Sequence, residues 1–391
     1  MLRILLLITC LFPYISFNLL DTDTQPWSML VSIFIIIYLS VKKKIRFPKP
    51  FRYFGISLIY VLFNLFINLL KNQTNLSEGL TSLSYYISIP LIIIAVYNIN
   101  PPKNFLKFFI IIYSIWLLFG LLQFYIPNIT GFIVRRQTEF SGGRGVTSLA
   151  PEPTWYSRSI ILFLIFSIIL YYNESINKRT FFILVGLSAF QVFILSSSIT
   201  GSFYFTLVII TYGFVYFKKK KQKFYYGGFL LIVLGLIFLI GLNYFQNKRV
   251  FHYLEIAMEN PSALTKLGGF NMRVLNAPMA FQAGIMDSSG LGKGVGVREE
   301  GSIYNYDFFD TEISKLDNGK AHGGLVTFIY EIGLLAFIWY VGFWKIIMYN
   351  RTINKRVRYF VLISLTLILF FESSPVNPIA AYLIGYMNNI K

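Results

Sequence analysis

The chain has 391 residues, of which 55% are hydrophobic and only 13% charged, and its mean hydropathy is +0.61. A soluble globular protein of this length does not combine so much apolar with so little charged composition. The formal charge of +18 would suit a nucleic-acid-binding protein, but the positions of the basic residues favour a membrane topology signal instead.

Apolar runs recur along the whole chain, and a helix needs about 20 residues to cross a hydrocarbon core of about 30 Å. The runs are solidly apolar rather than alternating, which predicts helices, since only a helix satisfies its backbone groups within one such segment. We therefore expect an all-α integral membrane protein, a single polytopic domain over residues 1–391. Its twelve spans are expected near residues 3–20, 27–41, 53–70, 82–97, 105–126, 156–172, 181–197, 202–217, 224–245, 323–344, 359–373 and 376–388.

The basic residues follow this topology. If the N-terminus is cytoplasmic, the inward segments carry 22 of the 35 Lys and Arg residues and one acid, Glu174, whereas 14 of the 17 carboxylates lie in outward segments. Such asymmetry is the positive-inside pattern. We expect a multi-pass inner-membrane protein with both termini in the cytoplasm. Cys10 is the only cysteine, so no disulfide forms within the chain.

Two outward segments are longer than the other connections: residues 127–155 and residues 246–322. Long loops of this kind usually have a function. Within the second, residues 251–259 and 271–286 have helical apolar spacing, and the second of these stretches is followed by a glycine series. This loop is expected to fold as a small helical cap beside a polar chamber that a lipid-borne substrate can enter.

The first candidate cluster is GGRGVTSLAPEPTWYS, residues 142–157. Arg144 is flanked by glycines, which allow close approach of a ligand, and its planar guanidinium suits bidentate contact with phosphate oxygens. Glu152 lies between two prolines, where a rigidly held carboxylate can orient a hydroxyl or accept its proton. The alternative is structural: Arg144 and Glu152 pair with each other and fix the loop to the bundle.

The second cluster is GGFNMRVLNAPMAF, residues 268–281, which places Arg273 in the first turn of an expected helix. An anion there would interact with both the guanidinium and the free N–H groups; the alternative is a solvated loop arginine. The nearby GLGKGVG, residues 290–296, does not lie between a strand and a helix, so it does not predict a nucleotide-binding loop.

The third cluster is AHGGLVTFIYEIGLLAF, residues 321–337, with His322 at the mouth of a span and Glu331 deeper within it. An interfacial histidine is often structural. A carboxylate inside an apolar helix is costly and normally faces a partner or a wet cavity. No group of His, Cys or acidic residues has metal-ligand spacing, so neither a metal nor another cofactor is expected.

Together, over roughly residues 140–340, these clusters resemble the O-antigen polymerase and ligase superfamily, the Wzy-type polysaccharide polymerases in particular. The resemblance rests on RGVTSLAPEP, on the serine-rich turn LSSSITGSF, on an arginine followed by an amphipathic helix and glycines, and on a histidine before E-x-G at Glu331 and Gly333. In one departure, Ser198 is followed by Ile199, where relatives often carry an arginine.

The resemblance implies a GT-C-like membrane glycosyltransferase that transfers a glycan from undecaprenyl pyrophosphate to an acceptor hydroxyl at the outer face of the membrane. Arg144 and Arg273 would hold the pyrophosphate, and Glu152 or His322 would activate the acceptor hydroxyl. The remaining phosphate or glycan contacts would come from Arg135, Arg136, Arg158 and Glu331.

Polymerisation of lipid-linked repeat units is the expected activity, with membrane lipid and a chain-length regulator as further partners and no role for nucleic acid. The alternatives are an O-antigen ligase that transfers glycan to a lipid A-core acceptor in lipopolysaccharide synthesis, a flippase or other transporter of lipid-linked oligosaccharide, and a structural subunit of an envelope complex. The absence of an internal repeat disfavours the transporter.

Overall fold

The structure is a computed structural model and describes residues 1–16, 24–134, 145–216, 280–297, 304–306, 311–313, 324–370 and 376–390. The described residues are almost entirely helical, as the apolar runs predict. Up to residue 216 they form α1 (Leu2–Leu11), α2 (Trp27–Val41), α3 (Phe51–Leu70), α4 (Leu76–Asn98), α5 (Phe105–Tyr125), α6 (Pro153–Tyr172), α7 (Lys178–Phe190), the π-helical turn η1 (Gln191–Leu195) and α8 (Ile199–Tyr216).

The second half contains shorter elements. In the described part of this half, a π-helical turn and the two strands of an antiparallel ladder precede four helices, and one 3₁₀ turn separates the first two of these helices. These elements are η3 (Gln282–Met286), β1 (Tyr304–Tyr306), β2 (Thr311–Ile313), α12 (Gly324–Ile332), η6 (Gly333–Leu335), α13 (Ala336–Ile347), α14 (Lys355–Phe370) and α15 (Pro378–Asn389).

Seven of the described helical segments are long and apolar enough to cross a membrane. They also expose large apolar side chains: on α3, Ile59 is 71% exposed and Phe63 is 61% exposed. Water would make such a surface costly, whereas lipid is as apolar as the side chains themselves. The protein is therefore a multi-pass membrane protein. The seven segments are Phe51–Leu70, Leu76–Asn98, Phe105–Tyr125, Pro153–Tyr172, Lys178–Leu195, Ile199–Tyr216 and Val326–Ile347.

Several of the expected spans have different bounds. The first helix ends at Leu11 rather than continuing to residue 20, because Pro13 lacks an amide hydrogen and disfavours helical backbone at Phe12. The run expected at 323–344 is divided by η6 into α12 and α13. The last run forms a helix of 12 residues, and the span expected at 224–245 lies outside the described residues.

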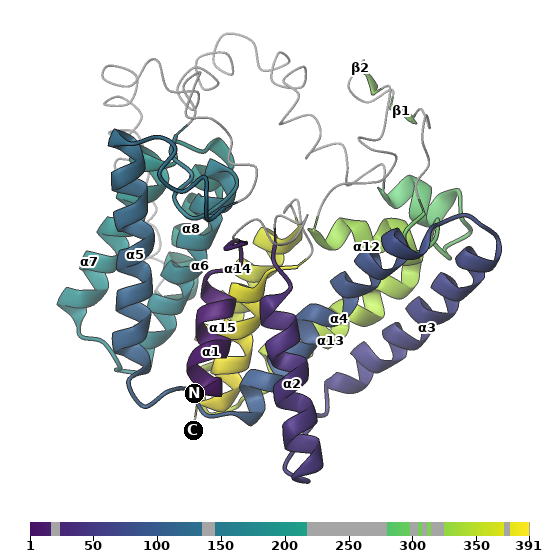
Figure 1. The fold of residues 1–391 in the computed structure, drawn as a ribbon, viewed down its shortest axis with the longest axis horizontal. Coiled ribbons are helices and arrows are strands. Elements are labelled where there is room, and N and C mark those ends of the chain that lie inside the picture. Colours follow the sequence, from purple (N-terminus) through teal and green to yellow (C-terminus); the bar gives the residue numbers. More distant parts are fainter. Residues whose placement is uncertain are drawn as a thin grey trace.

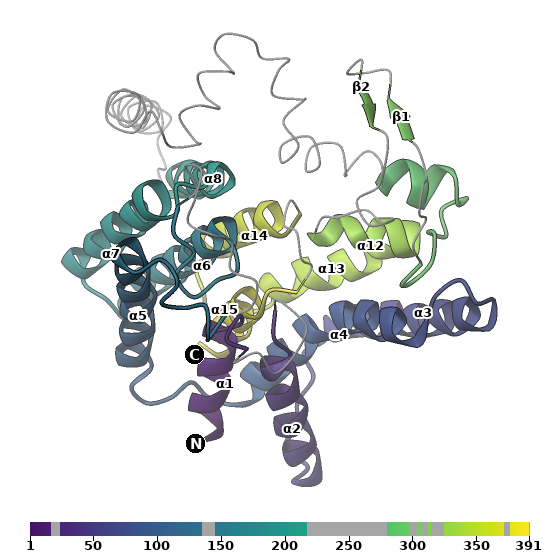
Figure 2. The ribbon, with the colours of Figure 1, turned by 45° about the horizontal axis from the view of Figure 1, so that its top comes forward.

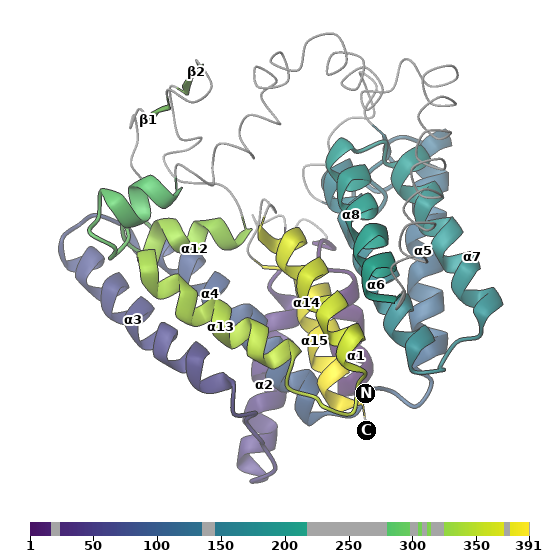
Figure 3. The same cartoon turned by 180° about the vertical axis from the view of Figure 1, so that it is seen from behind.

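The helices form two groups with a central row between them (Figure 1). One group contains α5, α6, α7 and α8; the other contains α2, α3, α4, α12 and α13. The row between them consists of α1, α14 and α15, and the view from behind shows the same order (Figure 3). The core lies where α6 and α15 meet their neighbours, since every residue from Tyr156 to Leu170 of α6 and from Pro378 to Asn388 of α15 is buried.

The connections between the helices lie at two opposite ends of the bundle. The start of α1 and the end of α15 lie together at one end, which we call the termini end (Figures 1 and 2). The α2–α3, α4–α5 and α13–α14 connections lie there too, and together with the adjoining helix turns they carry most of the described basic residues. The opposite end, the loop end, contains the α3–α4 turn and the start of α6. The basic residues thus gather at one end, as the charge pattern predicts.

Candidate functional site

The loop that precedes α6, residues 145–152, is held in place by Gln123 near the end of α5. Gln123 Oε1 accepts hydrogen bonds from the backbone N–H groups of Thr147 at 2.9 Å and Ser148 at 2.7 Å. Its Nε2 group donates to Thr147 Oγ1 at 3.0 Å and to the Pro127 carbonyl at 3.2 Å. Gln123 is 2% exposed, and hydrogen bonds made away from water are costly to lose. We call residues 145–152 the motif loop.

The motif loop packs against the serine-rich turn that joins η1 to α8. The Val146 N–H donates to the Leu195 carbonyl at 2.8 Å. A Cβ atom at Gly145 would lie 2.1 Å from the Ser196 carbonyl oxygen, so only glycine permits this approach. The turn itself follows a widened π-helical segment, a feature that often accompanies functional sites. The structure therefore brings GVTSLAPEP, the described part of the first motif, together with the serine-rich motif LSSSITGSF.

The first turns of α6 and α8 also meet at this point. The Ser198 hydroxyl donates to Thr154 Oγ1 at 3.2 Å and accepts from the Gly201 N–H at 3.2 Å, so it links the two helices and caps α8. At Gly201, a Cβ atom would lie 2.2 Å from Ser157 Oγ. Close contact of the two helix starts therefore depends on small polar residues, and it explains why the turn is rich in serine and glycine.

Arg158 lies one turn into α6 and is only 2% exposed. Its guanidinium carbon is 5.1 Å from the centre of the Trp155 ring, a cation–π distance. Trp155 in turn packs against Tyr14, with ring centres 5.3 Å apart. A positive charge is thus buried near the start of α6, the helix that follows the motif loop. Because the guanidinium is buried in this conformation, it could influence a ligand only through its electric field and not by surface contact.

Glu152 closes the motif loop and occupies the N-cap position of α6. Its backbone carbonyl accepts the N–H of Tyr156 at 3.0 Å, but its side chain makes no capping hydrogen bond. The side chain is exposed, while Pro153 at the first helical position fixes the backbone. A carboxylate in a rigid backbone that is not used for capping can accept a proton or a hydroxyl hydrogen bond from a ligand.

Of the other sequence-predicted site residues, only Glu331 lies within the described residues. Arg144 immediately precedes Gly145, so its neighbour is the residue that packs on Ser196. The proposed pairing of Arg144 with Glu152 is therefore untested. The residues outside the described part are Arg135, Arg136, Arg144, Arg273 and His322.

Glu331 is 1% exposed and lies where the helix from α12 to α13 is interrupted. Gly333 adopts φ +57°, which turns the chain at η6. The interruption leaves backbone carbonyls without their usual helical partners. They are taken up by residues 287–297, which we call the glycine loop: the Lys293 N–H donates to the Tyr330 carbonyl at 2.8 Å, and the Gly294 N–H donates to the Glu331 carbonyl at 3.0 Å.

The Glu331 carboxylate completes this contact. Its Oε1 accepts from the Gly296 N–H at 3.2 Å, and its Oε2 accepts from the Tyr86 hydroxyl of α4 at 2.9 Å. The loop needs glycine because φ is positive at all four positions of the series and because a Cβ atom at Gly292 would lie 2.3 Å from the Glu331 carbonyl oxygen. Of the helix expected at 271–286, residues 271–279 lie outside the described residues, and the described end is at Met286, before the glycine series. The series also joins the loop to α12 and α4.

Sequence reasoning missed a buried chain of polar side chains that joins α6 to its neighbouring helices. The Tyr156 hydroxyl donates to Gln191 Oε1 at 2.8 Å, and Gln191 Nε2 donates to the Tyr113 hydroxyl at 2.9 Å. Tyr113 also lies 3.0 Å from Ser188 Oγ. These residues connect α6, η1, α5 and α7. The available signal was the glutamine within an apolar run, because a buried amide needs hydrogen-bond partners.

Among the described residues, no group of three or more His, Cys, Asp or Glu side chains is placed to hold a metal ion. The arrangement at the loop end is instead one of a rigid exposed carboxylate, a buried guanidinium and closely packed helix starts. Comparison with known proteins adds no assignment: neither a protein-family model, nor a curated protein, nor a solved structure matches this chain.

Proposed function

We propose that this protein is a membrane glycosyltransferase that polymerises lipid-linked oligosaccharide repeat units at the outer face of a bacterial inner membrane. The observation that carries the proposal is the convergence of the motif loop, the serine-rich turn and the start of α6 at the loop end of an apolar bundle. Twelve spans in a GT-C-like arrangement, with both termini in the cytoplasm, belong to the same proposal. The donor would be an undecaprenyl pyrophosphate-linked glycan.

In the proposed reaction, the acceptor hydroxyl oxygen forms a bond to the anomeric carbon of the donor glycan. The bond from that carbon to the pyrophosphate oxygen breaks, and undecaprenyl pyrophosphate leaves with the electron pair. The acceptor proton moves to Glu152 as the new bond forms, because a hydroxyl is too weak an acid to ionise beforehand. Arg144 would contact the pyrophosphate, and buried Arg158 would stabilise its growing negative charge.

A purified enzyme in lipid nanodiscs tests the base assignment. We expect Glu152→Gln to bind the undecaprenyl pyrophosphate-linked repeat unit as the wild type does and to lose most single-turnover transfer. The matched control is Asp287→Asn, since Asp287 is also an exposed carboxylate at the loop end, and it should transfer normally. Rapid transfer by the Glu152→Gln enzyme would remove Glu152 from the reaction.

The same assay separates the alternative functions. A polymerase joins two lipid-linked repeat units, whereas a ligase needs a lipid A-core acceptor, and a flippase moves the lipid without forming a glycosidic bond. We expect Arg144→Lys to lose most polymer, because lysine keeps the charge but not the planar fork that binds two phosphate oxygens. Near-normal polymer from this variant would exclude Arg144 as a pyrophosphate clamp.

Orientation is tested with alkaline-phosphatase fusions, which are active only outside the cytoplasm. We expect activity for a fusion near Lys315 and none for a fusion near Lys221, because basic residues accumulate in the loops expected inside. The reverse pattern would place the loop end in the cytoplasm. It would also remove the proposed reaction from the outer face of the membrane.

A further inference from the structure

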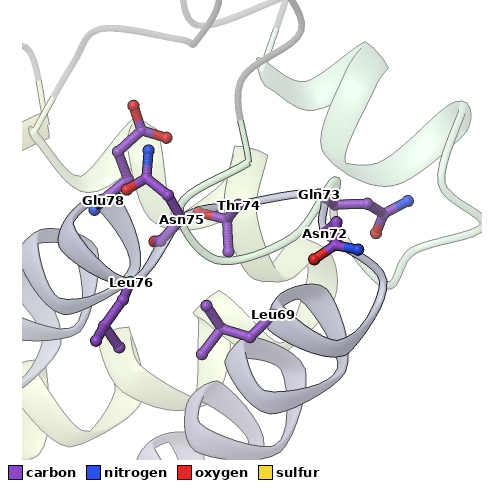
Figure 4. Close-up of a pocket in the computed structure, with 7 residues that line it drawn as sticks. All are labelled: Leu69, Asn72, Gln73, Thr74, Asn75, Leu76 and Glu78. Atoms are coloured by element: carbon purple, nitrogen blue, oxygen red, sulfur yellow. Dashed lines mark hydrogen bonds between the residues drawn. The ribbon is translucent and has the colours of Figure 1, made fainter.

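The α3–α4 turn contains an open depression of about 680 Å³ at the loop end of the bundle (Figure 4). Two leucines from the ends of the helices flank the turn, and polar side chains occupy the turn and the first turn of α4. The depression is open to solvent, so it can hold one part of a ligand that extends beyond it. The depression is lined by Leu69, Asn72, Gln73, Thr74, Asn75, Leu76 and Glu78.

The chemistry of the lining favours an uncharged, hydroxyl-rich ligand. Three amides provide both donors and acceptors, and the Glu78 carboxylate provides acceptors. Planar groups of this kind can hydrogen-bond to the neighbouring hydroxyls of a sugar ring, while the leucines can contact its C–H faces. The lining contains no lysine or arginine, so it is poorly suited to a phosphate or another anion.

The backbone that carries these side chains is held in place. The Asn75 side chain caps α4 by accepting the Glu78 N–H at 2.8 Å. The Thr74 hydroxyl donates to the Gly296 carbonyl of the glycine loop at 2.9 Å. Asn72 adopts φ +53°, a conformation that asparagine tolerates better than most residues. A preordered backbone lowers the entropy that a ligand must overcome on binding.

The depression and the proposed reaction site occupy different parts of the loop end. The α3–α4 turn belongs to one helix group and the start of α6 to the other (Figure 1). A site so placed cannot take part in bond formation at Glu152. It can, however, hold a distant part of a long substrate that extends across the loop end of the bundle.

We propose that the depression at the α3–α4 turn is a saccharide-binding subsite for the growing glycan. This inference rests on the proposed glycosyltransferase function and names a second contact with its product. By holding a repeat unit already incorporated, the subsite keeps the chain bound between transfers. Its loss should raise the acceptor KM and shorten the polymer while leaving kcat at saturating acceptor nearly unchanged.

The subsite is tested with the double variant Asn72→Gly and Gln73→Ala in nanodiscs. Glycine is chosen at position 72 because it adopts the positive φ without strain. Both amides are exposed, so the thermal stability of the variant should be unchanged. Asn128→Ala is the matched control, since Asn128 is another exposed amide that follows α5 and does not line the depression.

The binding probe is the oligosaccharide released by mild acid from the lipid-linked glycan pool of the source cells. We expect saturation-transfer NMR to show contact with the wild type and with Asn128→Ala, and to show little with the double variant. The acceptor KM should rise about tenfold in the double variant, as expected for one or two lost hydrogen bonds. Unchanged NMR transfer and an unchanged KM would overturn the subsite.

The two proposals fail in different ways. If the wild-type protein joins no repeat units, the glycosyltransferase function is wrong, whatever the NMR result. If the wild type polymerises while the double variant and Asn128→Ala give the same KM and the same chain lengths, only the subsite is wrong. A further variant, Glu78→Ala, should also raise the acceptor KM. Because Glu78 lies on α4 and not in the turn, this result would show that the ligand contacts the whole depression and not the turn alone.

Discussion

The motif loop and the glycine loop are both held in place by hydrogen bonds, but the acidic residues associated with them lie in opposite environments. One acid is exposed and the other is buried. The motif loop is held by a neighbouring side chain, Gln123, and Glu152 remains exposed. The glycine loop is held by the acid itself, because buried Glu331 accepts hydrogen bonds from Gly296 and Tyr86. In this protein the fold uses both carboxylate oxygens of Glu331 as acceptors, whereas the Glu152 side chain makes no capping hydrogen bond.

This comparison changes the interpretation of Glu331. The sequence predicted that a costly carboxylate in an apolar helix faces a partner or a wet cavity, and the family resemblance implied a substrate contact. In the structure that cost is offset by two hydrogen bonds within the protein, and the carboxylate joins α12, the glycine loop and α4. We infer that Glu331 positions the loop end, whereas Glu152 is available for chemistry.

The largest loss of folding stability should come from Gly292→Ala, which disrupts the glycine loop. An alanine there would have φ +84° and a Cβ atom 2.3 Å from the Glu331 carbonyl oxygen. Left-handed backbone and overpacking together should cost about 3 kcal/mol or more. Thermal unfolding in detergent measures the loss. Gly186→Ala is the control, because its Cβ would meet nothing within 4 Å and it should be neutral or slightly stabilising.

The next largest loss of stability should come from removing the Glu331 carboxylate. Glu331→Ala leaves the Gly296 N–H and the Tyr86 hydroxyl without their acceptor, and we expect a loss of about 2–3 kcal/mol. Glu331→Gln should lose less, since its oxygen can accept from Gly296 while its amide donates to the Tyr86 oxygen. Equal loss in both variants, measured by thermal unfolding, would contradict the hydrogen-bonding role and indicate that charge matters instead.

In the motif loop, the sensitive residue should be Gln123. Gln123→Leu keeps the approximate side-chain size but deprives the Thr147 and Ser148 N–H groups of their acceptor, at a cost of about 2 kcal/mol. The effect should be local. Hydrogen exchange should show faster exchange over residues 145–152, with little change in the glycine loop. Gln123→Glu retains the acceptor oxygen and should protect these two amides better than leucine does.

The smallest effect on stability should come from Glu152. Because the side chain is exposed and makes no capping hydrogen bond, Glu152→Ala should change the free energy of unfolding by less than about 0.5 kcal/mol. Measuring the thermal unfolding of Glu152→Ala and Glu331→Ala side by side therefore tests whether only the buried acid stabilises the fold. A large loss for Glu152→Ala would show that this carboxylate, too, is part of the folded framework.

The sequence by itself determined the helical membrane class, the approximate positions of most described helices and the segregation of basic residues to alternate connections. These properties follow from local composition, because each span satisfies its backbone within itself and each connection carries its own charges. The end of the helix before the glycine series was equally local. The proposed reaction and the residues outside the described part remain predictions.

Only the tertiary structure decided which acid is buried, where α12 is interrupted from α13, and that Gln123 holds the motif loop. Each outcome depends on partners that are distant in sequence: Tyr86 and Glu331 are 245 positions apart, and Gln123 and Thr147 are 24 apart. Residue type shows that a buried polar group needs a partner, but not which one. The choice is made when the helices pack, because only then do particular donors and acceptors come within reach of each other.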